Sequence, residues 1–300
     1  MNLNDEFNKR VVRAEKVLKD YMPKETGYQK DIMSAMNYSV SAGGKRLRPL
    51  ILMSSYMMYK SEGEVYKPFM AALEMIHNYS LVHDDLPCMD NDRLRRGKDT
   101  TWVKYGECMA VLTGDGLLNY AFETALKAFD MCSDIAEYKN CAKAMKILAN
   151  KAGIYGMIGG QVVDTAAEQS CSLIDEDELL FIHENKTGAL LEAAFMCGAV
   201  LAGAVEDEVK KLSKVALNVG LAFQIQDDIL DIEGDEKVLG KPVGSDEENQ
   251  KQTYVRIHGM EKSKKDVVSL IDEAVEILSS LNRDTEFLEY VIKSLIGRKA

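Results

Sequence analysis

The chain has 300 residues, which is enough for one large domain or two small ones. Its net charge of −11 counts against a nucleic-acid partner and against binding to an anionic membrane surface. With 46% hydrophobic and 28% charged residues, the composition is that of a globular protein. A protein this acidic that binds a polyanion needs a local basic patch or bridging metal ions.

Nothing in the sequence indicates export or a membrane anchor. Residues 1–6 lack the positive charge and the apolar core of a signal peptide. The longest apolar stretch, residues 190–205, is too short to span a bilayer and is interrupted by Glu192 and glycines. The six cysteines form no Cys-x-x-Cys and fit no zinc pattern, which is typical of reduced intracellular thiols. We therefore expect a soluble, cytoplasmic protein.

Helical periodicity runs through the chain, strand-like alternation is absent, and no repeat or linker divides it. Breaks fall at Gly43-Gly44, residues 61–63, Leu86-Pro87, Gly97 and residues 234–249. The predicted helices span residues 5–21, 46–59, 66–85, 109–128, 142–165, 176–202, 207–231, 263–280 and 285–296. We predict one all-α domain, residues 1–300, of roughly ten helices, with a core large enough to hold a central cavity.

The first polar motif is a glycine turn at a helix start, Gly43-Gly44-Lys45-Arg46-Leu47-Arg48-Pro49. Its glycines allow close approach of the backbone, and its cations suit a phosphate. The helix N-terminus adds a partial positive charge. A Gly-Gly-Lys turn alone is a weak signal and is more often structural.

An acidic cluster follows the helix predicted for residues 66–85. Asp84 and Asp90 are six residues apart, or about 240° around a regular helix, so they could not face the same way on one helix. Pro87 disfavours helical backbone at Leu86, however, and should end the helix there. The following loop can then return Asp90 to the side of Asp84. A loop cluster of this kind is otherwise often merely solvated.

Cations surround this first cluster. Arg95 and Arg96 come directly after it, where they could form simple ion pairs or could bind diphosphate oxygens with their guanidinium forks. His77 lies two turns before Asp84 on the same helix face, which places it towards the site. A lone helical histidine is otherwise usually a satisfied core residue.

A second acidic cluster lies about 140 residues later. Gln224, Asp227 or Asp228, and Asp231 form a polar stripe on an otherwise apolar helix, and Asp227 and Asp231 are one turn apart. Unpaired carboxylates are costly in such a setting, and bringing both clusters together makes physical sense only with cations bound. Carboxylate oxygens are what Mg²⁺ prefers, usually shared with substrate phosphates. Lys186-Thr187, Lys241 and Lys251 supply further cations, each ambiguous by itself.

Together these residues resemble the trans-polyprenyl diphosphate synthases over essentially the whole chain, and most of all the bacterial-type farnesyl diphosphate synthases. The segments that carry the resemblance are residues 43–49, 83–97, Gly159-Gly160-Gln161-Val162-Val163-Asp164, Lys186-Thr187-Gly188 and residues 224–244. Several long motifs in order make it very specific. The resemblance implies a helical bundle with a deep cavity, usually a homodimer. It also implies head-to-tail condensation of an allylic diphosphate with isopentenyl diphosphate.

The resemblance also implies roles for single residues. Metal ligands for a cluster of up to three Mg²⁺ ions would be Asp84, Asp85, Asp90, Asp227, Asp228 and Asp231. Arg95, Lys186 and Lys241, with Lys251 nearby, would bind the allylic diphosphate, and Lys45, Arg48, His77 and Arg96 would bind isopentenyl diphosphate. Thr187 and Gln224 would lie near the developing carbocation. The resemblance implies that released diphosphate takes the proton, so we name no catalytic base.

The family resemblance also bears on product length. A bulky aromatic just before the first acidic cluster limits chain elongation in this family, and Tyr79-Ser80 resembles the fifteen-carbon bacterial pattern. Tyr79 lies about 7–8 Å along the helix axis from Asp84. It could instead be a core aromatic that faces a neighbouring helix.

Three positions depart from the family pattern without removing a predicted ligand: Asp99, where proline is common, Trp102, and Asn91 in place of a frequent aspartate. Alternatives remain. A geranylgeranyl diphosphate synthase differs only in product. A terpene cyclase needs no second diphosphate site, which Lys45, Arg48, His77 and Arg96 argue against. A non-catalytic partner subunit should have degraded aspartate clusters, and both are intact.

Overall fold

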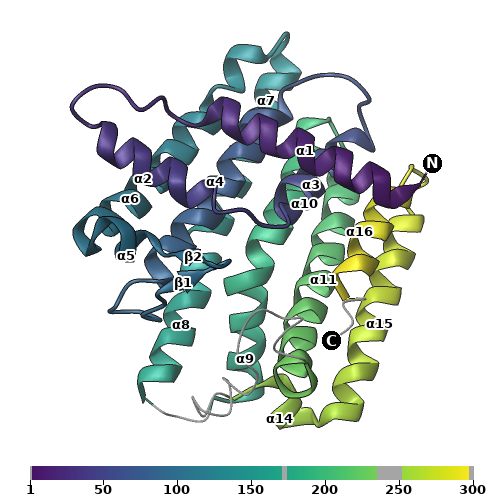
Figure 1. Ribbon diagram of the computed structural model, residues 1–300. Coiled ribbons are helices and arrows are strands. Elements are labelled where there is room, and N and C mark those ends of the chain that lie inside the picture. Colours follow the sequence, from purple (N-terminus) through teal and green to yellow (C-terminus); the bar gives the residue numbers. More distant parts are fainter. Residues whose placement is uncertain (1, 171–173, 235–251, 297–300) are drawn as a thin grey trace.

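The structure is a computed structural model that describes residues 2–170, 174–234 and 252–296, and it confirms the all-α fold (Figure 1). The first half contains α1 (Leu3–Tyr21), α2 (Lys30–Val40), α3 (Leu47–Met57), α4 (Tyr66–Asp84), α5 (Thr101–Tyr105), α6 (Glu107–Leu126), the short η1 (Phe129–Met131) and α7 (Ile135–Ala152). The second half contains α8 (Met157–Ser170), α9 (Glu176–Ile182), η2 (His183–Gly188), α10 (Ala189–Leu201), α11 (Glu206–Glu233), α14 (Tyr254–His258), α15 (Met260–Ser279) and α16 (Glu286–Ile296).

Two long helices form the centre of the molecule. α10 packs against α3, α4, α7 and α11, and nearly every residue of it is buried, which explains why its apolar residues show no single face. α4 packs against α6, α3, α1 and α2. Gly198 allows the closest of these contacts, because a Cβ there would lie 2.3 Å from the carbonyl oxygen of Leu52 on α3. This packing fixes the C-terminal ends of α4 and α11, which carry the two acidic clusters.

The sequence-based prediction differs from the structure in several places. It missed α2, an 11-residue helix that packs against α6 and α4, and the two five-residue helices α5 and α14. It joined α7 and α8 across residues 153–156, where Gly153 and Gly156 make a turn with the N–H of Gly156 donating to the carbonyl of Gly153 (3.0 Å). It also predicted no strands, whereas β1 (Leu94–Arg95) and β2 (Lys98–Asp99) form a short antiparallel hairpin.

That hairpin places the two arginines that follow the first acidic cluster. Arg96 and Gly97, at its turn, have φ angles of 55° and 74°, the left-handed conformation that two-residue hairpin turns require. Because Arg95 is in the ladder and Arg96 is in the turn, their side chains leave the backbone in different directions. The hairpin could not be predicted from the sequence pattern, because strands of two residues are too short to show a periodicity.

None of the helices in the described ranges is long and apolar enough to cross a membrane. The expectation that residues 1–300 form a single domain stays a prediction.

Candidate active site

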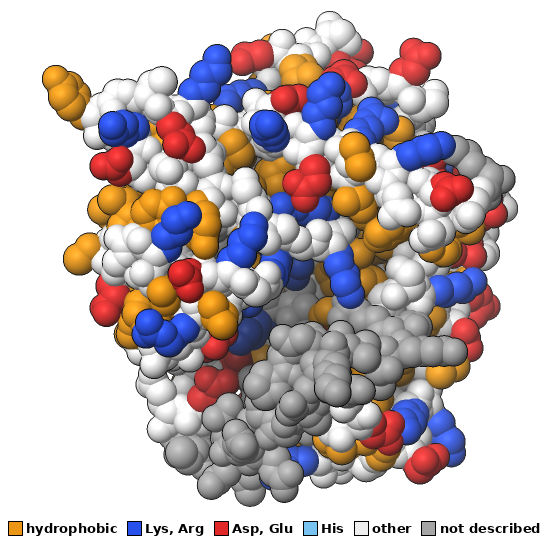
Figure 2. Space-filling view, in the orientation of Figure 1, with side chains coloured by type: hydrophobic (Ala, Val, Ile, Leu, Met, Phe, Trp, Pro, Cys, Tyr) orange, Lys and Arg blue, Asp and Glu red, His pale blue; other side chains and the backbone are white. Residues whose placement is uncertain are grey.

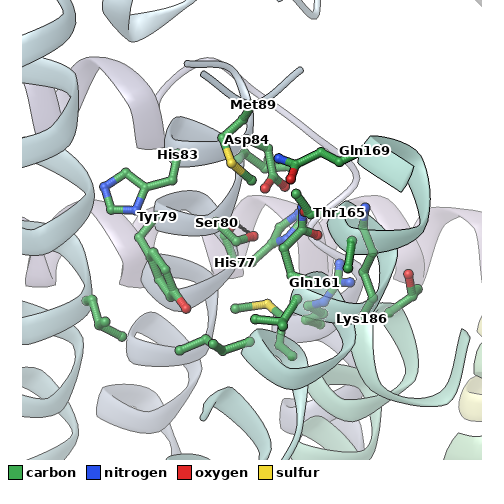
Figure 3. Close-up of a pocket in the computed structure, with 18 residues that line it drawn as sticks. His77, Tyr79, Ser80, His83, Asp84, Met89, Gln161, Thr165, Gln169 and Lys186 are labelled. Carbon is green, nitrogen blue, oxygen red and sulfur yellow. Dashed lines mark hydrogen bonds between the residues drawn. The ribbon is translucent and has the colours of Figure 1, made fainter. Parts of the chain in front are cut away.

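A cavity of about 660 Å³ lies between α4, α6, α8 and η2, within the size range of small-molecule sites (Figure 3). Its walls are mostly apolar and include Leu118, Met157 and Ile158. Polar side chains line it from all sides, and Figure 3 shows Asp84 and Gln169 at one end, with Tyr79 and Lys186 on opposite sides. The polar residues that line it are Arg48, His77, Tyr79, Ser80, His83, Asp84, Gln161, Thr165, Gln169, Lys186 and Thr187.

The first acidic cluster has the predicted geometry. α4 ends at Asp84, and the turn after it brings Asp90 back, so that the backbone N–H of Asp90 donates to the Asp84 carbonyl (2.8 Å). Asn91 donates to the Leu86 carbonyl (3.0 Å) with a left-handed φ of 54°, a conformation that asparagine tolerates well. Asn91, a departure from the family pattern, therefore suits this turn.

Asp84 is an unusual carboxylate. Its pKa is raised to about 6, mainly by burial and also by the nearby Asp90, although Lys186 and Arg95 act in the opposite direction. A carboxyl group in this state has lost hydration that a bound cation could replace. Asp84 therefore stands to gain from a bound metal ion.

Asp85 faces elsewhere. It is buried and lines a small separate cavity beneath the hairpin, where its Oδ1 accepts from Nε of Arg95 (2.7 Å) and pairs with Nη2 (2.5 Å). This ion pair holds Arg95 next to the cluster. The prediction that Asp85 binds a metal stays a prediction, and the structure adds a protein partner for this carboxylate.

Asp99 and Trp102, the other two positions that differ from the family pattern, also make contacts that support this loop. The carbonyl of Asp92 accepts from Nε1 of Trp102 and from Oγ1 of Thr100, both at 2.8 Å. The carbonyl of Asp99 accepts from the Tyr38 hydroxyl (2.8 Å). These bonds hold the hairpin against α2 and α5.

Lys186 and Thr187 enter the cavity from η2, a π-helical turn in the helix predicted for residues 176–202. π-helical turns concentrate at functional sites. Gly160 of α8 makes room for the turn, since a Cβ there would lie 2.2 Å from the backbone nitrogen of Lys186. The Lys186 ammonium pairs with the buried carboxylate of Asp164, which fixes its direction while Asp84 feels its charge.

A second, basic cavity of about 400 Å³ adjoins the first and shares Arg48 and His77 with it. Lys45, Arg48, His77 and Arg96 all line it, as the resemblance implies. The Arg96 guanidinium donates to the Gly43 carbonyl, and Gly44 leaves the space it occupies, because a Cβ there would lie 2.8 Å from its Cζ. Figure 2 shows Lys and Arg side chains gathered around a hollow on this face.

The buried groups of the basic cavity fit an anion. Burial lowers the pKa of the Arg48 guanidinium, and its Nε has no hydrogen-bond partner in the described part of the chain. Burial, and then Arg48 and Arg96, lower the pKa of His77 well below its usual range, so the imidazole is neutral at pH 7. A buried, unpaired guanidinium donor is costly unless a ligand such as a phosphate accepts from it.

Arg46 has a different role from its neighbours. It is buried at 3% exposure, its Nε contacts Glu15 (2.6 Å), its Nη1 contacts Glu74 (2.7 Å), and its Nη2 donates to the Val40 carbonyl (2.6 Å). Groups of the protein itself therefore pair with each nitrogen of its guanidinium. Arg46 also lines the basic cavity, but it braces the glycine turn, because these three groups already engage its guanidinium.

The second acidic cluster lies at the end of α11, which packs directly against η2 through Gly220 and Gly188. Gln224, Asp227 and Asp231 are not among the described residues that line the two cavities. Asp228 is buried, and its Oδ2 accepts from the backbone N–H of Tyr254 (2.8 Å). Lys241 and Lys251 lie outside the described residues.

The acidic residues suit Mg²⁺ by their chemistry. Among the described residues, no three His, Cys, Asp or Glu side chains lie close enough together to hold a metal ion by themselves. Mg²⁺ does not need such a cage, because it keeps several waters and binds one or two carboxylates together with substrate phosphates. All of the predicted donors are carboxylates, and Asp84 has a raised pKa of the kind that cation binding relieves. The donor set therefore fits the ion.

Three residues of the site were missed by sequence reasoning. Asp164 had been quoted in the Gly159–Asp164 motif without a role, and only the fold shows that it pairs with Lys186, 22 positions away. Thr165 and Gln169 follow Gln161 at intervals of four residues, so all three line the cavity from one face of α8. The i, i+4, i+8 spacing of these three polar residues was the available signal.

Comparisons with known proteins agree with this site. The pattern of the Polyprenyl synthetase family matches residues 29–293. A farnesyl diphosphate synthase of Geobacillus stearothermophilus is 40% identical over 97% of this chain and 96% of its own. A geranylgeranyl diphosphate synthase of Cyanophora paradoxa is 45% identical over 82% of this chain and 80% of its own. A geranyltransferase of Helicobacter pylori, in complex with magnesium and isoprenyl diphosphate, superimposes with a TM-score of 0.81 at 31% identity, covering 99% and 97% of the two chains.

The chain belongs to the polyprenyl synthetase family. The family resemblance and the all-α isoprenoid synthase fold predicted from the sequence are both confirmed.

Proposed function

We propose that the chain catalyses the Mg²⁺-dependent head-to-tail condensation of isopentenyl diphosphate with dimethylallyl or geranyl diphosphate, and that farnesyl diphosphate is its main product. The observation that carries this proposal is the pair of adjoining cavities. One is small and basic, the other is apolar with Asp84 and Lys186 on its wall, and they share Arg48 and His77. Two diphosphate substrates that react with each other need such neighbouring sites.

In the proposed reaction the aspartates of the two acidic clusters, together with Lys186 and Arg95, prepare the allylic diphosphate. Asp84, Asp90, Asp227 and Asp231 would hold Mg²⁺, and Lys186 and Arg95 would bind the diphosphate directly. Bound Mg²⁺ stabilises negative charge on the departing diphosphate and so favours cleavage of the C–O bond. Asp164 pairs with Lys186, and Asp85 pairs with Arg95. These ion pairs would hold the two side chains in place before the substrate binds.

The apolar walls then protect the reactive cation. Leu118, Met157 and Ile158 exclude water, which would otherwise add to an allylic carbocation. Thr187, from η2, also lines this cavity and would contribute its hydroxyl dipole. Arg48, Lys45, Arg96 and neutral His77 would hold isopentenyl diphosphate in the basic cavity, so that its double bond is presented to the neighbouring cavity.

The test is chromatography of the products formed from purified protein, Mg²⁺, labelled isopentenyl diphosphate and dimethylallyl diphosphate. We expect a fifteen-carbon alcohol to predominate after dephosphorylation. A twenty-carbon product would support geranylgeranyl diphosphate synthesis, the activity named for the Cyanophora relative. No incorporation by folded protein would contradict the proposal and favour a terpene cyclase or a non-catalytic partner subunit.

We further infer that the protein acts as a homodimer. Large apolar side chains are exposed on α6 and α8, on the left of Figure 1, among them Leu112 (52%), Leu126 (53%) and Val162 (62%). Val162 also lines the reaction cavity, so a second copy on this face would help to close it. Exposed apolar surfaces of this kind mark protein interfaces.

The dimer can be tested by mass in solution. We expect wild-type protein to sediment at twice the chain mass of 33.5 kDa. Leu112→Glu should sediment as the monomer, because it would bury a charge in the contact. Val12→Glu, at a 70% exposed apolar position on α1, serves as the control and should remain dimeric. A wild-type monomer would contradict the inference.

A further inference from the structure

Asp228, the second of the two adjacent aspartates on α11, is held by a hydrogen bond within the protein. Oδ2 of Asp228 accepts a hydrogen bond from the backbone nitrogen of Tyr254 at 2.8 Å. Both residues are buried, with exposed fractions of 9% and 8%. A carboxylate removed from water to this extent needs such a donor, and the bond is worth more than one between neutral groups.

The hydrogen bond from Tyr254 to Asp228 lies at the start of a helix. Tyr254 is the first residue of α14, and the first N–H groups of a helix have no acceptor within the helix. The side chain of Thr253 accepts from the Arg256 nitrogen (3.3 Å), while the Tyr254 nitrogen donates to Asp228. The partial positive charge at the start of α14 also favours a carboxylate there. Asp228 thus completes the cap of α14 from a different helix.

α14 in turn connects three other parts of the bundle. The Tyr254 hydroxyl donates to Asp266 on α15 (2.8 Å), and Nε2 of His258 lies 3.1 Å from a carboxylate oxygen of Glu176 at the start of α9. α9 continues directly into η2, which carries Lys186 and Thr187. The place of α14 on α11 is therefore coupled to the frame of the reaction cavity.

The geometry of α11 separates Asp228 from Asp227. Asp227 and Asp231 are four residues apart and differ by about 40° around the helix, whereas Asp228 is rotated by about 100° from Asp227 and by about 60° from Asp231. The first cluster shows the same division, because Asp84 lines the reaction cavity while the adjacent Asp85 lines a separate cavity and binds Arg95.

We propose that Asp228 is a positioning residue that anchors α14 to α11, and that metal binding by this cluster falls to Asp227 and Asp231. The inference rests on the proposed function for the metal, but the anchor itself does not. It predicts that the Tyr254 amide is protected from solvent exchange even in metal-free protein.

The first experiment is hydrogen exchange of residues 252–258 in the full-length, metal-free protein, followed by mass spectrometry with single-residue resolution. We expect the wild-type Tyr254 amide to be protected, and Asp228→Ala to speed its exchange by about tenfold or more, the loss expected for a bond to a buried carboxylate. Asp228→Asn keeps an acceptor oxygen of the same shape and should retain most of the protection. Asp227→Asn is the matched control and should leave Tyr254 exchange unchanged.

The second experiment is the Mg²⁺ concentration for half-maximal turnover. We expect it to rise by about tenfold or more in Asp227→Asn, and by about threefold or less in Asp228→Asn. Equal weakening by the two substitutions would overturn the inference, as would a Tyr254 amide that exchanges freely in wild-type protein. If wild-type protein shows no Mg²⁺-dependent turnover, the proposed function fails, while the exchange experiment still decides whether Asp228 anchors α14.

Discussion

Replacing Asp84 with asparagine is expected to reduce kcat by about 10³-fold, the scale seen when one preorganised charge-stabilising group is removed from an active site. Asparagine has nearly the same size as aspartate but lacks the charge. Asp84 ends α4 on the wall of the reaction cavity, and the turn after it places Asp90 beside it. Steady-state turnover with dimethylallyl and isopentenyl diphosphate at saturating Mg²⁺ measures the loss.

The same substitution should stabilise metal-free protein at neutral pH. The pKa of Asp84 is raised from 3.8 to about 6 in the folded state, first by burial. Between these values the folded state binds more protons than the unfolded state, so stability falls as pH rises through this window, and the full cost is present above about pH 6. Asp84→Asn should therefore gain about 1–3 kcal/mol at pH 7.5 and much less at pH 4.

Denaturant unfolding at the two pH values, in the presence of a chelator, measures that gain. Asp207→Asn is the control, because this α11 carboxylate is 93% exposed and should change neither activity nor stability. A variant that loses activity together with stability would indicate a structural role for Asp84. A variant that keeps wild-type turnover would contradict its proposed place at the metal site.

Replacing Tyr79 with alanine is expected to change the main product from fifteen carbons to twenty or more. Tyr79 is 6% exposed, lines the reaction cavity, and packs edge-on against His83 with ring centroids 5.9 Å apart. His83 is itself fixed, because its Nε2 lies 3.0 Å from the Val111 carbonyl and it occupies the space left by Gly114 on α6. The Tyr79 ring therefore has little freedom to move aside for a longer chain.

Product chromatography decides this prediction, with Tyr79→Phe as the matched control. Burial, and then Asp84, raise the pKa of the Tyr79 hydroxyl to about 12, so phenylalanine removes no charge and should leave the product length unchanged. An unchanged fifteen-carbon product from a folded Tyr79→Ala protein would show that another residue limits elongation. Circular dichroism should accompany the assay, because the cavity that alanine leaves destabilises the protein by about 3 kcal/mol or more.

Much of the fold could be predicted from local patterns. Long amphipathic helices such as α1 and α15 were predicted within a few residues, because one apolar face against a core leaves a periodic signal. α2 was missed, although one face of this 11-residue helix is buried and the helix packs against α6 and α4. The β1–β2 hairpin was missed because its strands are two residues long.

The site divides in a similar way. Pro87 and the spacing of Asp84 and Asp90 were enough to predict the turn that joins them, because proline restricts the backbone locally. The partners of Lys186 and Asp228 were not predictable, since each lies more than 20 residues away in sequence. Nor could sequence tell that Arg46, between two cavity-lining cations, is neutralised by Glu15 and Glu74.

The sequence by itself determined the family, the helical class, the candidate acidic and basic side chains of the site and the turn at Pro87. These depend on residue type and on short-range spacing, which the backbone geometry of a helix or a proline turn makes rigid. Only the tertiary structure decided which charged side chains form ion pairs within the protein and which line the cavities. Neighbouring residues on a helix point in directions about 100° apart, so Asp84 and Asp85 face different cavities, and the packing of distant helices supplies what each side chain meets.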